Sequence, residues 1–214
     1  MIQKLLIAIP SYDTMRAEFV QSLTALMQRL NREGQAYEVK ILTGTLVHVA
    51  RDHLARHAIN NGFSHVLWID SDMVFQDSIV EDLAMSGKDM VCGSFISRHS
   101  PYLNVVFSRL EPNAERITDM PDDLFRIAGC GFGCVFMKTQ VLGDVMNGNG
   151  GRCFLPTQKL GEDLAFCQRA VGCGYEIWCE PTARLGHIGA VPIWPEDAER
   201  MRGEIQELNG KKLE

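Results

Sequence analysis

The chain has 214 residues, of which 46% are hydrophobic, enough to build a sizeable core in one domain of ordinary size. Its formal net charge of -6 argues against a broadly basic face, so extended binding to nucleic-acid phosphates or to an anionic membrane is not expected. No apolar run approaches the roughly 20 residues of a membrane span, and the first ten residues lack the features of a signal peptide, so we expect a cytoplasmic protein.

The first 75 residues carry alternating strand and helix patterns. Strands are expected over residues 4–9, 37–41 and 66–69, which are short apolar or alternating runs. Helices are expected over residues 15–30 and 47–58, where apolar residues recur every three or four positions and a glycine follows. This order predicts a parallel sheet with helices on its faces, and ligands of such sheets gather at the carboxyl ends of the strands.

The patterns in the rest of the chain are weaker. Ser78 followed by Glu81 resembles the capping box of a short helix that runs through Met85. Further strands are expected over 90–96, 103–110, 129–137 and 175–179, a helix over 162–171 and a glycine-rich loop over 143–151. Residues 195–214 are strongly charged and predict a peripheral helix or tail after a single domain over 1–194. The seven cysteines, an odd number in mostly apolar surroundings, are expected to be reduced core thiols.

The stretch VLWIDSDMVF, residues 66–75, places Asp70 and Asp72 at the end of a buried strand. An ionised carboxylate in such a position costs several kcal/mol to desolvate unless a cation or hydrogen-bond donors compensate. Pro10 to Asp13 follow the first strand, so parallel strands would bring both segments to one crevice. A metal ion is the simplest partner for the two carboxylates.

Two later features complete the pattern. Glu162 and Asp163 begin a predicted helix, where acidic side chains also suit the helix dipole, and His187 stands among apolar residues in LGHIG. A histidine in such company is either a hydrogen-bonded structural residue or a ligand. Two carboxylates and an imidazole suit Mn²⁺ or Mg²⁺, which would leave positions open for the phosphates of a nucleotide and assist a departing diphosphate. Asp163 is then the candidate general base for a hydroxyl acceptor.

On the segments IPSYD, VARDHLA, IDSD, GED and LGHIG, the chain resembles glycosyltransferases of the GT-A fold, similar to short family 2-like members that include phage proteins, over roughly residues 4–190. The resemblance implies an α/β, Rossmann-like GT-A fold with a mostly parallel central sheet, helices on both faces and a small acceptor-side sheet. It divides the domain into a nucleotide-binding half, 1–97, and an acceptor half, 98–194. It implies metal-dependent transfer of a sugar from a nucleotide-diphosphate sugar, preferably a UDP-sugar, to a hydroxyl acceptor.

The same resemblance assigns roles to single residues. The residues implied to contact the donor are Pro10, Ser11, Asp13, Arg51, Asp70, Ser71 and Gly131. Those implied to hold the metal, directly or through its water, are Asp72, Asp70 and His187. Asp163 is implied to be the base of an inverting reaction, and Glu162 to bind acceptor or sugar hydroxyls. The sequence departs from the family pattern at CGFGC, with more cysteines than expected, and at Asp52, where asparagine is more familiar.

Two other functions fit part of the pattern. IDSDMV also fits a haloacid-dehalogenase-type phosphatase, with Asp70 as nucleophile and Asp72 as acid and base, although that motif normally ends the first strand of its domain. A nucleotide-sugar-binding module without catalysis is the other alternative. Arg98 and His99 follow a predicted strand at the crevice edge and are candidates to meet the diphosphate or the acceptor. The donor sugar and the acceptor stay open, including a modified DNA base, which the acidic balance supports weakly.

Overall fold

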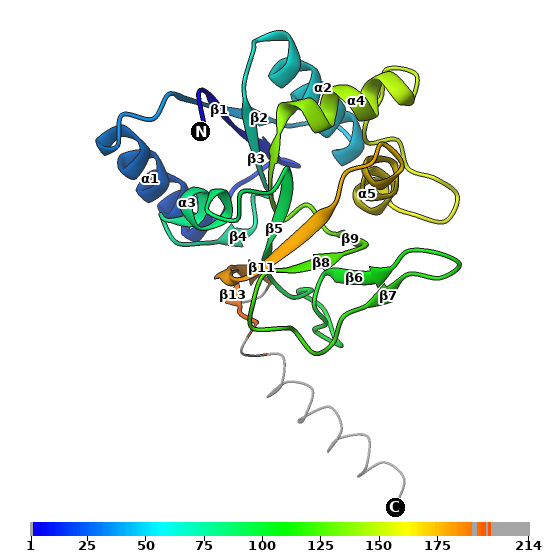
Figure 1. The fold of residues 1–214 in the computed structure, drawn as a ribbon. Coiled ribbons are helices and arrows are strands. Elements are labelled where there is room, and N and C mark those ends of the chain that lie inside the picture. Colours follow the sequence, from blue (N-terminus) through cyan, green and yellow to red (C-terminus); the bar gives the residue numbers. More distant parts are fainter. Residues whose placement is uncertain (1, 190–191, 196, 198–214) are drawn as a thin grey trace, which may run out of the picture.

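The computed structural model describes residues 2–189, 192–195 and 197. The strands of its main sheet are β1 (Leu5–Pro10), β2 (Tyr37–Leu42), β3 (His65–Ile69), β5 (Met90–Ser94), β8 (Phe125–Ile127), β10 (Cys134–Lys138) and β11 (Ile177–Arg184). They form one seven-stranded sheet in the order β2-β1-β3-β10-β5-β11-β8 (Figure 1). Strands β1, β2, β3, β5 and β11 run in one direction, and β10 and β8 run in the other.

Helices cover both faces of this sheet. They are α1 (Ala17–Arg32), α2 (Val47–Asn60), α3 (Ile79–Ala84), α4 (Thr139–Gly148) and α5 (Glu162–Gly172). Figure 1 shows α2, α4 and α5 on one face and α1 and α3 on the other. Buried side chains of the first group form a core with one face of the sheet, and those of the second group form a core with the other face. Strand β1 serves both cores because successive side chains point to opposite faces: Leu6 packs in the first core, and Leu5 and Ile7 pack in the second.

Two small three-stranded sheets flank the carboxyl ends of the main strands. One has the order β13-β12-β4, with β4 (Met73–Val74), β12 (Gly186–Ile188) and β13 (Pro192–Ile193). The other has the order β7-β6-β9, with β6 (Val106–Arg109), β7 (Glu115–Arg116) and β9 (Gly129–Cys130). The expected mostly parallel sheet, its helices on both faces and a small additional sheet are therefore confirmed. In the described part of the chain, no helix is both long and apolar enough to cross a bilayer.

Three expectations about local structure were wrong. The strand expected over residues 129–137 is divided into β9 and β10, because β9 pairs with β6 while β10 pairs between β3 and β5. The loop expected over residues 143–151 is largely helical, because α4 continues to Gly148 on a buried stripe of Val141, Leu142 and Val145. That burial outweighs the roughly 1 kcal/mol that a glycine costs inside a helix.

The capping box expected at the start of α3 is the third. Ser78 makes no capping hydrogen bond to the backbone, and its hydroxyl donates instead to Asp82 at 2.8 Å. The cysteines, in contrast, lie as expected: none forms a disulfide, and all except Cys173 are buried. Most of the charged segment expected over residues 195–214 falls outside the described residues.

Candidate functional site

The ends of β1 and β3 form one side of a cavity of about 360 Å³. Both strands run in the same direction and are hydrogen-bonded neighbours, so the residues that follow them meet at one edge of the sheet. The cavity is lined by Pro10, Ser11, Tyr12, Thr14, Arg16, Thr45, Val47, Ala50, Asp70, Ser71, Asp72 and Arg98. The two sequence segments expected to converge, the loop after β1 and the acidic stretch after β3, therefore do so.

Strand pairing places His187 beside Asp72. Strands β12 and β4 are antiparallel, with His187 opposite Met73, and the Ile188 N–H donates to the Asp72 carbonyl at 2.7 Å. The Nε2 atom of His187 lies 3.4 Å from Oδ2 of Asp72. Its Nδ1 is 2.9 Å from the Ile96 carbonyl, and because a carbonyl can only accept, Nδ1 carries the hydrogen. The other ring nitrogen therefore faces Asp72.

This donor set fits a divalent cation. A carboxylate oxygen and an imidazole nitrogen lie side by side, and a hydrogen bond from the second ring nitrogen to a backbone carbonyl is the usual support of a metal-binding histidine. Within the described ranges, no three or more His, Cys, Asp or Glu side chains form a closed cluster of protein ligands. A cation held by Asp72 and His187 would therefore take its remaining ligands from substrate or water, as Mg²⁺ and Mn²⁺ sites commonly do.

Arg51 connects two of the predicted catalytic segments. It lies on α2 with its side chain only 3% exposed, and its Nη2 donates to Oδ1 of Asp70 at 2.8 Å. Its Nη1 is 3.5 Å from Oε1 of Glu162, the first residue of α5. Burial raises the pKa of Asp70, and the guanidinium opposes that rise. The described ion pairs of Arg51 are thus with carboxylates, its guanidinium also lies 5.2 Å from the centre of the Phe132 ring, and its contact with a nucleotide stays a prediction.

Asp163 is a carboxylate whose surroundings suit a general base. Burial, together with the charge of Glu162, raises its pKa to about 6, close to the range in which a base is ionised yet still accepts a proton well. Its Oδ1 accepts the Leu164 N–H at 2.7 Å. Gly131 lies next to it: a Cβ added there would be in ordinary contact with Oδ2 of Asp163 at 3.6 Å but would clash with Cγ1 of Val105 at 2.6 Å.

Asp52 holds the segment that leads to α5, a role that the sequence analysis did not assign. Its side chain is buried on α2, and Oδ1 accepts the backbone N–H groups of Cys153 and Phe154 at 2.8 and 2.9 Å. The sequence did mark this position, because Asp52 stands where the family pattern more often has asparagine. Two adjacent residues of α2 therefore hold this part of the chain. Asp52 binds the segment before α5, and Arg51 contacts Glu162, the first residue of α5.

Two residues of the loop after β1 differ from expectation in their placement. Asp13 is not among the cavity-lining residues, and its Oδ1 accepts the Thr14 N–H at 2.6 Å. Tyr12 lines the cavity with 82% of its surface exposed, whereas only its neighbours Ser11 and Asp13 were expected at the site. An aromatic residue in a loop at the end of a buried strand was the signal that could have identified it.

Charges of both signs meet around Asp72. Arg98 hydrogen-bonds to its Oδ2, and although burial opposes ionisation of Asp72, His187 and Arg98 outweigh it and lower the pKa of this carboxyl. Burial likewise opposes the charged form of His187, but the hydrogen bond with Asp72 raises its pKa.

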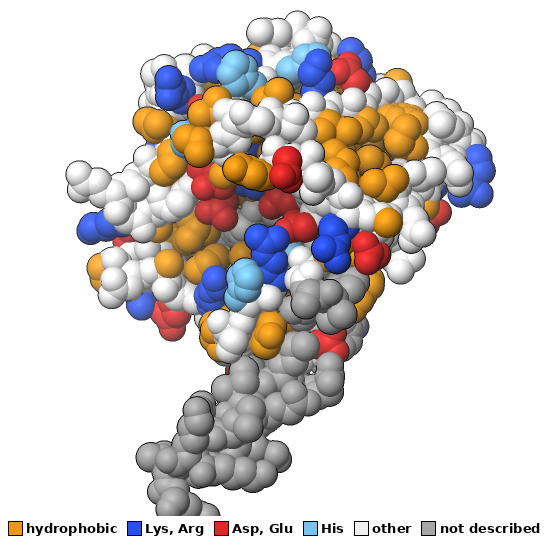
Figure 2. Space-filling view, turned by 180° about the vertical axis from the view of Figure 1, so that it is seen from behind, with side chains coloured by type: hydrophobic (Ala, Val, Ile, Leu, Met, Phe, Trp, Pro, Cys, Tyr) orange, Lys and Arg blue, Asp and Glu red, His pale blue; other side chains and the backbone are white. Residues whose placement is uncertain are grey.

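Acidic and basic side chains also lie next to one another across the middle of the face in Figure 2. The basic side chains there lie beside acidic ones, unlike the uninterrupted basic stripe that tracks a nucleic-acid backbone.

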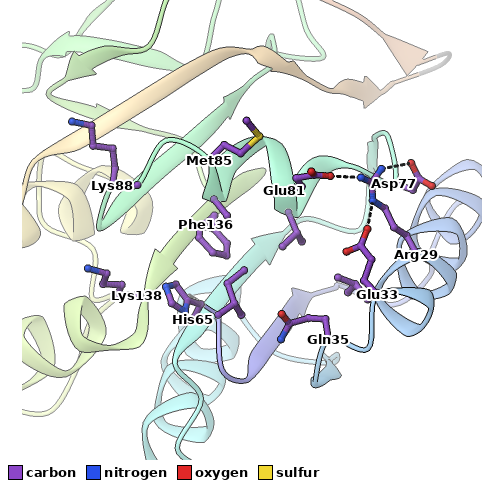
Figure 3. A pocket seen from close by; sticks show the side chains of 15 residues that line it. Arg29, Glu33, Gln35, His65, Asp77, Glu81, Met85, Lys88, Phe136 and Lys138 are labelled. Atoms are coloured by element: carbon purple, nitrogen blue, oxygen red, sulfur yellow. Dashed lines mark hydrogen bonds and ion pairs between the residues drawn. The ribbon is translucent and has the colours of Figure 1, made fainter.

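A larger cavity of about 560 Å³ lies at the opposite ends of the strands, where β3 begins with His65 (Figure 3). Figure 3 shows Arg29 of α1 paired with Glu33, Asp77 and Glu81, which joins α1 to the segment around α3. This cavity is separated by the length of β3 from Asp70. None of the predicted site residues lines it.

The chain matches no protein-family model and no curated protein. Among solved structures it is similar to A197 from STIV, with a TM-score of 0.59 and 19% identity over 88% of this chain and 86% of that chain. It is also similar to GalNAc-T7, crystallised with UDP, GalNAc and Mn²⁺, with a TM-score of 0.58 and 11% identity over 88% of this chain and 44% of that chain. At these identities the similarity shows the fold alone, which is the GT-A-like α/β fold expected from the sequence.

Proposed function

We propose that this protein is a metal-dependent glycosyltransferase that moves a sugar from a nucleotide-diphosphate sugar to a hydroxyl acceptor. The observation that carries the proposal is that His187 lies beside Asp72, which lines a cavity together with the loop after β1. A UDP-sugar is the favoured donor, supported by the UDP in the GalNAc-T7 structure. In this proposal residues 1–97 are the nucleotide-binding half and residues 98–194 are the acceptor half, which also contributes His187 to the metal site.

The metal site would be Asp72 and His187, with Asp70 close by and held by Arg51. Mn²⁺ or Mg²⁺ bound there would neutralise the charge that develops on the departing diphosphate. Pro10, Ser11, Tyr12 and Ser71 line the cavity in which the nucleotide would lie.

Asp163 would accept the proton of the acceptor hydroxyl while the acceptor oxygen bonds to the anomeric carbon and the bond from that carbon to the diphosphate oxygen breaks. Attack by the acceptor itself gives an inverted product. Glu162 would bind a hydroxyl of the acceptor or sugar. Arg51, by pairing with Glu162 and Asp70, would fix α5 relative to the donor site.

The test is thermal unfolding with UDP and UDP-sugars, each with MnCl₂ and with EDTA. A ligand at 100 times its Kd adds about 2.7 kcal/mol to stability, so the wild-type protein should be stabilised by UDP only when Mn²⁺ is present. Asp72→Asn should lose this dependence, whereas Asp122→Asn, which removes an exposed carboxylate outside the cavity, should keep it. Equal stabilisation of the Asp72 variant and the wild-type protein would contradict the ligand assignment.

The same preparations separate the alternative functions. Turnover of an aryl phosphate without any nucleotide sugar would favour the phosphatase, with Asp70 as nucleophile. Metal-dependent UDP binding without transfer to any class of acceptor, including glycans, lipids, proteins and DNA, would favour a binding module.

A further inference from the structure

Arg98 lies in a segment that contacts both proposed metal ligands. Its Nη1 donates to Oδ2 of Asp72, the same oxygen that lies 3.4 Å from Nε2 of His187. Two residues earlier, the Ile96 carbonyl accepts the hydrogen bond from Nδ1 of His187. The segment after β5 therefore supplies a cation to one proposed ligand and orients the other.

The two arginines of the site differ in how firmly they are held. Arg51 is 3% exposed and is fixed between two carboxylates. Arg98 is 45% exposed, and Asp72 is the only ion-pair partner recorded for it among the described residues. An ion pair with an exposed guanidinium contributes little net free energy, so the guanidinium leaves the half-buried carboxylate at low cost.

The backbone around Arg98 is anchored independently of its side chain. The Ser97 N–H donates to the Leu103 carbonyl at 2.9 Å, and the Leu103 N–H donates to the Ser97 hydroxyl at 3.1 Å. These bonds close the segment into a loop at its base. The Arg98 side chain can therefore change rotamer while the Ile96 carbonyl stays in place for His187.

We propose that Arg98 exchanges partners during donor binding: it neutralises Asp72 in the free protein, yields Asp72 to a divalent cation, and then binds the diphosphate of the donor. This inference rests on the proposed function. A guanidinium and a divalent cation repel each other on one carboxylate oxygen, so binding of the cation displaces Arg98. Arg98 lines the cavity, and its planar fork matches the oxygens of a diphosphate.

The exchange predicts opposite effects on the two ligands when Arg98 is removed. The cation alone should bind more tightly, because it no longer competes with the guanidinium. UDP in the presence of the cation should bind less tightly, because a charged hydrogen-bond donor is lost. A residue that only stabilises the loop would not change the two affinities in opposite directions.

The experiment is calorimetric titration with MnCl₂ alone, followed by UDP at saturating MnCl₂, for the wild-type protein, Arg98→Gln, Arg98→Lys and Arg109→Gln. Arg98→Gln should bind Mn²⁺ roughly two- to fivefold more tightly, and UDP roughly tenfold or more weakly, than the wild-type protein. Arg98→Lys keeps the charge and should stay near the wild-type affinity for Mn²⁺. Arg109→Gln removes a surface cation paired with Glu115 and should change neither affinity.

Each contrary result has its own meaning. Wild-type Mn²⁺ affinity in Arg98→Gln would overturn the exchange, while Mn²⁺-dependent UDP binding by the same protein would leave the proposed function standing. Unchanged UDP affinity in Arg98→Gln would overturn the contact with the diphosphate. A wild-type protein that binds neither millimolar Mn²⁺ nor UDP would overturn the proposed function and the exchange together.

Discussion

Replacing Asp163 by Asn should stabilise the protein at neutral pH while abolishing transfer. Burial and the charge of Glu162 raise the pKa of Asp163 from 3.8 to about 6. At about 1.4 kcal/mol for each pH unit, its ionisation costs the folded state about 3 kcal/mol relative to the unfolded chain. Because the folded pKa lies above the unfolded value, the wild-type protein loses this stability as the pH rises from about 4 to about 6. Asn does not ionise, and its side-chain oxygen can still accept the Leu164 N–H.

The assay is thermal and urea unfolding of the two proteins at pH 4.5 and pH 7.5. The Asn variant should be more stable by about 1 kcal/mol at pH 4.5 and by about 3 kcal/mol at pH 7.5, where its Tm should be roughly 6 to 12 °C higher. Asp122→Asn removes an exposed carboxylate and serves as the matched control for the loss of one acidic side chain. In the wild-type protein, kcat/KM for transfer should fall about tenfold for each pH unit below about 6.

Two results would refute this reasoning. A difference in stability that does not grow between pH 4.5 and pH 7.5 would mean that the fold does not disfavour the Asp163 carboxylate. Transfer retained by the Asn variant would remove Asp163 from the role of base, whatever its pKa.

The other predictions concern the groups around this carboxylate. Arg51→Met leaves Asp70 and Glu162 without their shared cation and should lower the free energy of unfolding by roughly 3 kcal/mol, measured in urea; an unchanged value would mean that the bridge contributes nothing. Gly131→Ala places a Cβ 2.6 Å from a Val105 methyl group and should cost about 1 to 3 kcal/mol and reduce kcat, whereas wild-type stability and kcat would show that the close approach is unimportant.

The elements with a strong hydrophobic period were predictable. Strand β1 is buried along its whole length and reads as a continuous apolar run, and α1 and α2 follow the three- and four-residue spacing of a buried stripe. The convergence of the loop after β1 with Asp70 and Asp72 followed from parallel pairing alone. That prediction required no knowledge of which side chains contact one another.

The contacts that join distant segments were not predictable in the same way. His187 reaches Asp72 through β12 and β4, and β4 has only two residues and no period of its own. Arg51 and Glu162 are 111 positions apart, so their pairing depends on how α2 and α5 pack on the sheet. The sequence suggested which residue types belong to the site, whereas tertiary packing determined which of them touch.

The order of the strands makes the two halves of the chain inseparable. Strand β10 lies between β3 and β5, which do not pair with each other. During synthesis β3 and β5 precede β10, because both come before it in the sequence. A nascent chain of 97 residues therefore contains β3 and β5 but lacks the strand that pairs with both of them. Unpaired strand edges can pair with other chains, so this risk lasts until residues 134–138 have been synthesised. Cutting the protein at residue 97 would split a sheet, and the two fragments would have to find each other to restore it.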